Sequence, residues 1–328
     1  MVFKKYKFSF LLVFILAASN SNGQILCKKN AFLMGGTFEF SVIVQDTMTG
    51  YIAIEECITE IRRIENLLSD WIPASQVSQV NKYAGMRAIR VDREVFRLTQ
   101  QAFYFSEITL GSFDISFAAM DRIWRFDGSM DTMPSAEAVA RSVENVGYKN
   151  ILLDSMQSTI FLKKEGMKIG FGALGEGYAV DRCRAMMIRK GITSGLINAT
   201  GDIAAWGIQA DGMPWRVGIR NPFKKNRIIK VLPIHNEAVT TSGSYEKYVE
   251  FDGKRFSHII NPKTGYPATG LTSVTVIGPD ALTSNFLSTS IMVLGRKAGL
   301  KLLKTYPTYK AILITDRGRV IRTDRLGR

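Results

Sequence analysis

The amino-acid sequence predicts an α+β fold in a single domain. Helical and strand-like patterns follow each other in separate runs, without the steady strand–helix alternation that is typical of a parallel α/β sheet. With 46% hydrophobic and 22% charged residues among 328, the chain can bury a large core and does not have a disordered composition. No long linker, low-complexity run or repeat divides the sequence, so we expect one continuous domain.

The N-terminal residues have the pattern of a secretory signal peptide. Three lysines precede the apolar residues 8–18, a stretch too short to span a bilayer, which takes about 20 helical residues. Small residues just before Gln24 predict cleavage at that point. We therefore expect a signal peptide at 1–23, a folded domain at 24–328 and an exported, periplasmic protein.

The chain is strongly basic, with 43 Lys and Arg against 29 Asp and Glu, a net charge of +14. These residues are scattered rather than gathered into a stripe, so we expect no nucleic-acid partner. The excess suits an anionic cofactor or the surface of a membrane, and a generally basic surface explains it equally well. A lipid on Cys27 would attach the chain to a membrane, although the residues before Cys27 are a poor lipoprotein cleavage context.

Hydrophobic periodicity places the elements of the first half of the chain. Residues 38–44 alternate and include β-branched and aromatic side chains, which predicts a strand. Apolar residues recur at helical spacing through 51–68, which predicts an amphipathic helix. We expect further helices at 95–108 and, after a Pro-Ser pair, at 136–146, and short strands at 151–153, 159–163 and 167–169.

In the second half, the strongest local signal is a hairpin. Asp252-Gly253 separates two strand-like runs, 248–251 and 255–260, and this dipeptide favours a tight turn. The other expected elements are helices at 174–189 and 282–294, extended segments at 195–198 and 215–219, a strand at 271–277, and a terminal hairpin of 311–314 with 320–321.

Two stretches of small residues could contact a ligand. Residues 111–116 (GSFDIS) place a carboxylate among small and hydroxyl residues after a helix, although an ordinary helix-to-loop turn explains this stretch better when it is taken alone. Residues 170–177 (GFGALGEG) bring four glycines to the start of a helix, where free N–H groups favour phosphate. Close helix–sheet packing is the alternative, and the glycine spacing is not that of the dinucleotide fingerprint.

Imidazole chemistry near neutral pH has two candidates, because His235 and His258 are the only histidines in the sequence. His258 ends a predicted hairpin strand and precedes a turn rich in Pro and Gly, the kind of rim where catalytic groups occur. A lone histidine is more often structural than catalytic, and we assign that role to His235.

Asn285 and Thr289 form the fourth candidate feature. They lie four residues apart in a predicted apolar helix, so they share one face and could present two oxygens to a hard cation. Neither side chain is charged, and ordinary helix-surface polarity explains the pair equally well.

Together, and in this order, these stretches resemble the ApbE family of FAD:protein FMN transferases, exported flavin enzymes of bacteria. The resemblance covers nearly the whole mature chain. Its segments are 34–37 (MGGT), 68–71 (LSDW), 75–81, 111–116, 170–181, 198–202, 241–243 and 257–267, and it ends at Gly295.

The resemblance implies a single α+β domain that cleaves the pyrophosphate of FAD, moves FMN onto a threonine of an acceptor protein as a phosphodiester, and releases AMP. It implies that His258 is the general base toward the acceptor hydroxyl. It also implies that the flavin nucleotide is bound by Met34, Trp71, Ser112, Phe113, Asp114, Gly170, Glu176 and Ile259.

The resemblance further implies a Mg²⁺ site made by the carbonyl of Ala173 with Asn285 and Thr289. The family pattern has Asp where Asn285 stands, and Gly170 replaces a carboxylate that is common in the family. An amide lacks the charge of a carboxylate, so we expect a weaker site. Two functions stay open: a transferase in which Ser288, FAD phosphates and waters complete the site, or an FAD-binding protein or weak FAD pyrophosphatase with impaired transfer.

The acceptor implied by the resemblance is a flavoprotein subunit that carries a flavinylation-motif threonine, for example in a redox-driven membrane complex. We expect this chain to meet its acceptor protein in the periplasm. A second form of the hypothesis places this basic chain on the periplasmic surface of the membrane. A structural adhesion or scaffold domain, which would bind no flavin, is the least favoured alternative.

Overall fold

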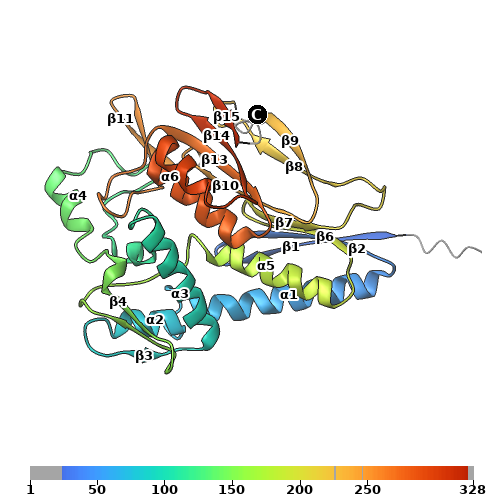
Figure 1. The fold of residues 1–328 in the computed structure, drawn as a ribbon, viewed down its shortest axis with the longest axis horizontal. Coiled ribbons are helices and arrows are strands. Elements are labelled where there is room, and N and C mark those ends of the chain that lie inside the picture. Colours follow the sequence, from blue (N-terminus) through green and yellow to red (C-terminus); the bar gives the residue numbers. More distant parts are fainter. Residues whose placement is uncertain (1–23, 225–226, 246, 324–328) are drawn as a thin grey trace, which may run out of the picture.

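The computed structural model describes residues 24–224, 227–245 and 247–323, and it confirms the predicted α+β fold (Figure 1). The predicted signal peptide, 1–23, lies outside the described residues. The main sheet has eight strands, and every neighbouring pair in it is antiparallel. In spatial order they are β1 (Ile25–Leu33), β2 (Gly36–Val44), β6 (Ser194–Ala199), β7 (Asp202–Trp206), β10 (Ala238–Gly243), β13 (Leu271–Gly278), β14 (Lys310–Thr315) and β15 (Val320–Arg322).

Three long helices cover one face of this sheet. They are α1 (Thr47–Leu68), α5 (Gly175–Arg189) and α6 (Ala281–Leu303). Buried residues repeat at helical spacing along α1, so its apolar stripe packs on β1 and β2. Helix α6 is broken at Gly295, whose backbone has φ 72° and ψ 174°, and this agrees with the predicted end of the helix at residue 294.

A hairpin covers the opposite face of the sheet. It is formed by β8 (Trp215–Arg220) and β9 (Ile228–Ile234), and its apolar side packs on Ile43, Val239 and Ile312. The neighbouring residues on those sheet strands belong to the core beneath the helices, because successive side chains of a strand point to opposite faces. The sheet therefore has an apolar layer on both sides, which explains why its strands alternate so little between apolar and polar residues.

A second group of shorter elements packs at one end of the helices (Figure 1). Helix α3 is the longest of them and joins the main core through Phe105, which stacks on Phe286 of α6. The group comprises α2 (Gln76–Lys82), α3 (Arg93–Ile108), α4 (Ala136–Ser142), the 3₁₀ helices Ile115–Ala119 and Tyr148–Asn150, and a small sheet in the order β3 (Ile89–Arg90), β5 (Thr159–Leu162), β4 (Ile151–Asp154); a separate hairpin pairs β11 (Tyr248–Phe251) with β12 (Lys254–Ser257).

The start of α6 is fixed by two carboxylates. The Asp181 side chain, from α5, accepts hydrogen bonds from the backbone N–H groups of Ala281 and Leu282 at 2.9 to 3.0 Å. Asp280 caps the same turn by accepting from the Thr283 N–H at 2.7 Å. Together they satisfy donors that a helix N-terminus otherwise leaves without partners. The glycine at 177 allows α5 and α6 to pack closely. A side chain there would not fit, because its Cβ would lie 2.9 Å from the Ala281 carbonyl oxygen.

Residues 167–169 are not the strand that we predicted. Met167 and Ile169 are fully buried, as the apolar pattern indicated, but the backbone of Ile169 pairs with a side chain instead of a strand. The Asn81 amide accepts from the Ile169 N–H at 2.8 Å and donates to its carbonyl at 2.9 Å. A single long-range side chain thus takes the place of a neighbouring strand.

Several predicted boundaries move, and six helices and strands were not predicted, nor were the two 3₁₀ helices. The fourth helix ends at Ser142 rather than at 146, and the second hairpin strand ends at Ser257 rather than at 260. The elements that the pattern missed are β1, α2, β3, β7, β9 and β10. β1 was missed because it is an edge strand with two lysines, and half of its residues face solvent.

Replacing Asp181 with Ala should lower the free energy of unfolding by about 1–3 kcal/mol, because buried backbone donors at the start of α6 lose their acceptor. Urea unfolding followed by circular dichroism measures this change. The matched control is Asp131→Ala, an exposed residue outside any helix or strand, which should stay within about 0.5 kcal/mol of the parent. Equal unfolding midpoints for the two variants would contradict the assigned role.

Candidate active site

A cavity of about 610 Å³ lies where α5, α6 and the 111–118 segment meet. Its volume is in the range of about 300–1,000 Å³ that is usual for ligand sites. The lining includes eleven of the twelve residues that the sequence analysis assigned to the site. These are Trp71, Ser112, Phe113, Asp114, Gly170, Ala173, Glu176, His258, Ile259, Asn285 and Thr289.

Met34 is the predicted site residue that does not line the cavity. It occupies the tight turn between β1 and β2 with a left-handed backbone, φ 52°, and its neighbour Gly35 reaches the cavity instead. The Met34 methyl group packs against Gly175 at the start of α5, where a Cβ on the glycine would lie 3.0 Å from it. Met34 therefore supports the glycine-rich segment from behind.

The carboxylate of Asp114 is used to shape the loop that carries it. One oxygen accepts from the N–H and the hydroxyl of Ser116, at 2.8 and 2.6 Å, and the other accepts from the Tyr148 N–H at 2.7 Å. Burial raises the pKa of the Asp114 carboxyl, and these hydrogen bonds oppose the rise. Phe113 anchors the same loop by packing its ring edge-on against Phe286. Asp114, which we predicted to contact the ligand, therefore also stabilises the conformation of its own loop.

The 170–177 segment brings backbone close to the cavity. A Cβ at Gly170 would lie 3.0 Å from the Ala118 side chain and 3.5 Å from the Asp70 carboxylate, so the carboxylate that the family resemblance would place at 170 finds little room here. Glu176, in the first turn of α5, accepts a hydrogen bond from the Thr200 hydroxyl. Burial raises the pKa of the Glu176 carboxyl, while Thr200 and the positive charge of Lys247 lower it.

A chain of hydrogen bonds joins three secondary-structure elements at the floor of the cavity. The Asn285 amide donates to the Asp202 carboxylate, and its oxygen accepts from the Thr289 hydroxyl at 3.3 Å. The Ser242 hydroxyl lies 3.2 Å from that of Thr289. Asp202 is only 5% exposed, and this burial raises the pKa of its carboxyl to about 7, with a further rise from the charge of Glu176 and an opposing effect of the Asn285 hydrogen bond.

The oxygen atoms at this floor suit a hard cation. Asn285, Thr289 and Ala173 all line the cavity and offer amide, hydroxyl and carbonyl oxygens, and the carboxylate of Asp202 stands beside them. Within the described ranges, no group of three or more His, Cys, Asp and Glu side chains could hold a metal ion. Amide, hydroxyl, carbonyl and carboxylate oxygens are the donors that Mg²⁺ prefers, so the residues present fit this ion.

His258 stands at the rim with its tautomer defined. Its Nδ1 lies 3.2 Å from the carbonyl oxygen of Lys247, and its backbone N–H donates to the same oxygen at 3.1 Å. A carbonyl oxygen only accepts, so in the neutral ring Nδ1 carries the proton and Nε2 keeps a lone pair. The side chain is exposed and lines the cavity. The ring is thus oriented to accept a proton at Nε2.

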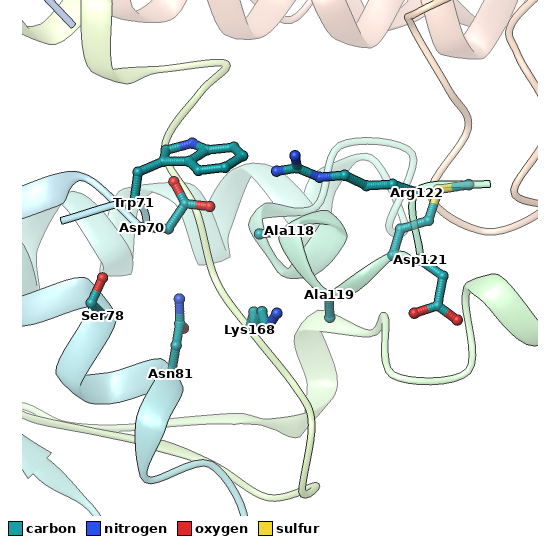
Figure 2. A pocket seen from close by; sticks show the side chains of 10 residues that line it. Asp70, Trp71, Ser78, Asn81, Ala118, Ala119, Asp121, Arg122 and Lys168 are labelled. Atoms are coloured by element: carbon teal, nitrogen blue, oxygen red, sulfur yellow. The ribbon is translucent and has the colours of Figure 1, made fainter. Parts of the chain in front are cut away.

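Trp71 separates this cavity from a second one of about 450 Å³ (Figure 2). The indole is 68% exposed, and the Arg122 guanidinium lies 4.1 Å from the centre of its ring, a cation–π contact. Figure 2 shows Arg122 extending toward the indole from the opposite side of the cavity, above Lys168. Asp70 and Ala118 line both cavities, so Trp71 stands at their shared wall.

Sequence reasoning did not assign site roles to Asp202, Lys247 or Arg122. Asp202 carried a weak signal, since a carboxylate that opens an apolar strand (DIAAW) must be buried for a reason. Lys247 and Arg122 are exposed cations in loops, and only the fold places them beside the cavities. Their position depends on long-range packing, which no local pattern records.

The sheet, the helices and the cavity together define an α+β class of protein with a polar cavity beside the glycine-rich start of α5. Comparison with known proteins gives the family. The model of the ApbE family matches residues 34–313, and the chain therefore belongs to the ApbE family.

Relatives and solved structures agree with this assignment. The chain is 32% identical over 263 residues to an FAD:protein FMN transferase of Klebsiella pneumoniae strain 342, covering 80% of this chain and 81% of the relative. It is 29% identical over 285 residues to the enzyme of the same name from Treponema pallidum, with 82% and 79% covered. The ApbE protein of Thermotoga maritima superposes with a TM-score of 0.83 at 30% identity, covering 92% of this chain and 98% of that one. The flavinyl transferase ApbE of Pseudomonas stutzeri gives 0.79 at 26% identity, with 92% and 94% covered.

Removing the brace at Asp114 should weaken flavin binding. We expect Asp114→Ala to raise the Kd for FAD by about tenfold or more, since the loop loses the acceptor of three hydrogen bonds, and a buried donor left unsatisfied costs about 1–3 kcal/mol. Titration of FAD by quenching of flavin fluorescence measures the Kd. The control is Asp121→Ala, an exposed carboxylate on the same segment, and its Kd should match the parent value. An unchanged Kd in Asp114→Ala would mean that this loop does not position the flavin nucleotide.

Proposed function

We propose that this chain is an FAD:protein FMN transferase that cleaves FAD and attaches FMN through a phosphodiester to a threonine of an acceptor protein, with Mg²⁺ as the metal. The observation that carries the proposal is the single cavity that joins an oriented imidazole at its rim to an oxygen-rich floor. A phosphoanhydride transfer needs both: a base for the incoming hydroxyl and a site that tolerates the phosphates.

The chain's own groups support each part of the reaction. Nε2 of His258 takes the proton of the acceptor threonine, while the Lys247 carbonyl holds the ring in place at Nδ1. The threonine oxygen forms a bond to the FMN phosphorus, the bond from that phosphorus to the bridging oxygen breaks, and AMP leaves with the bridging oxygen. The proton on His258 then passes to AMP or to solvent, which restores the base.

The floor of the cavity would hold the metal. Ala173, Asn285 and Thr289 are the residues that would bind Mg²⁺. Mg²⁺ bound there would neutralise the negative charge on the phosphates as the anhydride breaks. The Lys247 side chain lines the same cavity and adds a positive charge near the nucleotide. Residues 170–176 bring backbone close to the bound phosphates, and Trp71 offers an exposed aromatic face to a planar ring.

We further propose that the chain is exported to the periplasm after removal of 1–23, and that its acceptor is a flavoprotein subunit with a flavinylation-motif threonine, such as one of a redox-driven membrane complex. The net charge, +14 for the full chain and +11 once the three lysines of 1–23 are removed, supports association with an anionic membrane surface. The described ranges contain no helix with the length and apolar character needed to cross a bilayer. Cys27 is 1% exposed beneath α1, which argues against a lipid at that residue.

The mature protein, incubated with FAD, Mg²⁺ and a peptide or domain that carries the flavinylation motif, should yield fluorescent covalent FMN on the acceptor and an equal amount of AMP. Gel fluorescence and chromatography measure the two products. An acceptor with Ala in place of the threonine is the control, and it should stay unlabelled. AMP with free FMN alone would identify a pyrophosphatase, and intact bound FAD would identify a flavin-binding protein.

His258→Ala should keep FAD binding close to the parent value and slow the transfer by about 10²–10⁴-fold, the usual contribution of a general base. Single-turnover transfer rates and the Kd for FAD, measured on the same preparation, separate the two effects. His235→Ala is the matched control, since this second histidine lies outside the cavity lining, and it should transfer at the parent rate. Transfer by His258→Ala at the parent rate would remove His258 as the base.

A further inference from the structure

Asp202 and Asn285 form a carboxylate–amide pair across two elements at the cavity floor. Asp202 begins β7, and Asn285 lies in the second turn of α6, 83 residues away in sequence. The Asn285 Nδ2 donates to Asp202 Oδ2, so the amide oxygen is left to face Thr289, whose hydroxyl donates to it at 3.3 Å. The Asp202 carboxylate therefore orients the Asn285 amide. It also places a negative charge next to this neutral side chain.

Asp202 has little else to balance its charge. It is 5% exposed and lines the cavity, and the charged groups that act on its pKa, Glu176 and Asp181, are themselves carboxylates that raise it. In contrast, the partly buried Asp181 carboxylate has the α6 backbone donors and Arg184, 3.5 Å away, as partners. A buried carboxylate is retained at such a position when a cation or a set of donors compensates it.

The substrate increases this imbalance. The pyrophosphate of FAD would bring further negative charge into a cavity that Asp202 and Glu176 already line. Lys247 is the one cation among the described lining residues of this cavity, and its effect is exerted on Glu176. Four carboxylates line this cavity, Asp70, Asp114, Glu176 and Asp202, and a divalent cation bound with the pyrophosphate would offset the repulsion among these charges.

We propose that Asp202 supplies the anionic charge of the metal site through its pair with Asn285, so that the two side chains act as one carboxylate–amide unit toward Mg²⁺. This inference rests on the proposed function for the identity of the metal and the substrate. It means that the neutral side chain at 285 does not leave the site uncharged. Asp202 is accordingly a positioning and charge-supplying residue, and Asn285 provides the oxygen.

The test uses Mn²⁺ alone as the probe, with the full mature protein, no FAD and no acceptor. The solution EPR signal of free Mn²⁺ reports binding directly, so transfer activity does not enter the measurement. Asp202→Asn should weaken Mn²⁺ binding by about tenfold or more, the size of effect seen when a partner of a metal ligand is lost. The exchanged double variant, Asp202→Asn with Asn285→Asp, puts the carboxylate on α6 and should recover the parent affinity to within about threefold.

Two controls separate this effect from general changes. Asp154→Asn removes an exposed carboxylate of β4 that does not line the cavity, and its Mn²⁺ affinity should equal that of the parent. Thermal unfolding of every variant identifies loss of fold. If Asp202→Asn is unstable, the exchanged variant still tests the proposal, because it keeps one carboxylate and one amide of the same shape at the two positions.

The proposal is overturned if the parent shows no saturable Mn²⁺ binding, or if Asp202→Asn binds like the parent. It is also overturned if Asp154→Asn weakens binding as much as Asp202→Asn, or if the exchanged variant binds no better than Asp202→Asn. A parent that binds Mn²⁺ in this way but transfers no FMN would reject the proposed function and leave the metal pair in place.

Discussion

The contact between α5 and the start of α6 determines where the other site residues can lie. Asp181 accepts the first N–H groups of α6, and Gly177 allows the backbone of the two helices to approach without an intervening side chain. Glu176 precedes this contact on α5, and Asn285 follows it on α6 by one turn. Two segments that are a hundred residues apart in sequence thereby become neighbouring walls of one cavity.

The fold class was predictable from sequence because the apolar stripes are long. The apolar pattern at 51–68 identified α1, a helix of 22 residues that begins at Thr47, without any tertiary information. β1 and β10 were missed for the opposite reason, since lysines and hydroxyl residues dilute their apolar pattern and only the neighbouring strands stabilise them. The error at 167–169 has a similar origin, because Asn81 satisfies that backbone from a distant helix.

The site was predictable mainly as a set of segments. The resemblance to a family selected eleven residues that the structure brings to one cavity, but the roles that we gave them were incomplete. Asp114 braces its own loop through three hydrogen bonds, and Met34 supports a glycine from outside the cavity. Asp202 escaped attention because its partner, Asn285, is known only once β7 and α6 are placed together. A local pattern can identify a polar residue in an apolar segment, but it cannot identify the group that compensates it.

The two ends of the cavity differ in a way that suits a macromolecular acceptor. At the floor, Asp202 is buried and bonded to Asn285, and the Ser242 hydroxyl lies 3.2 Å from that of Thr289, so the phosphates would meet fixed dipoles that need little reorganisation. At the rim, His258 and Trp71 are exposed, and the Nδ1 side of the imidazole is held by a carbonyl oxygen. A threonine on another protein can reach Nε2 only from solvent, whereas a dinucleotide must enter fully to reach the floor. The buried floor would therefore hold the phosphates of the dinucleotide, and the exposed rim would receive the threonine, which stays attached to its own protein.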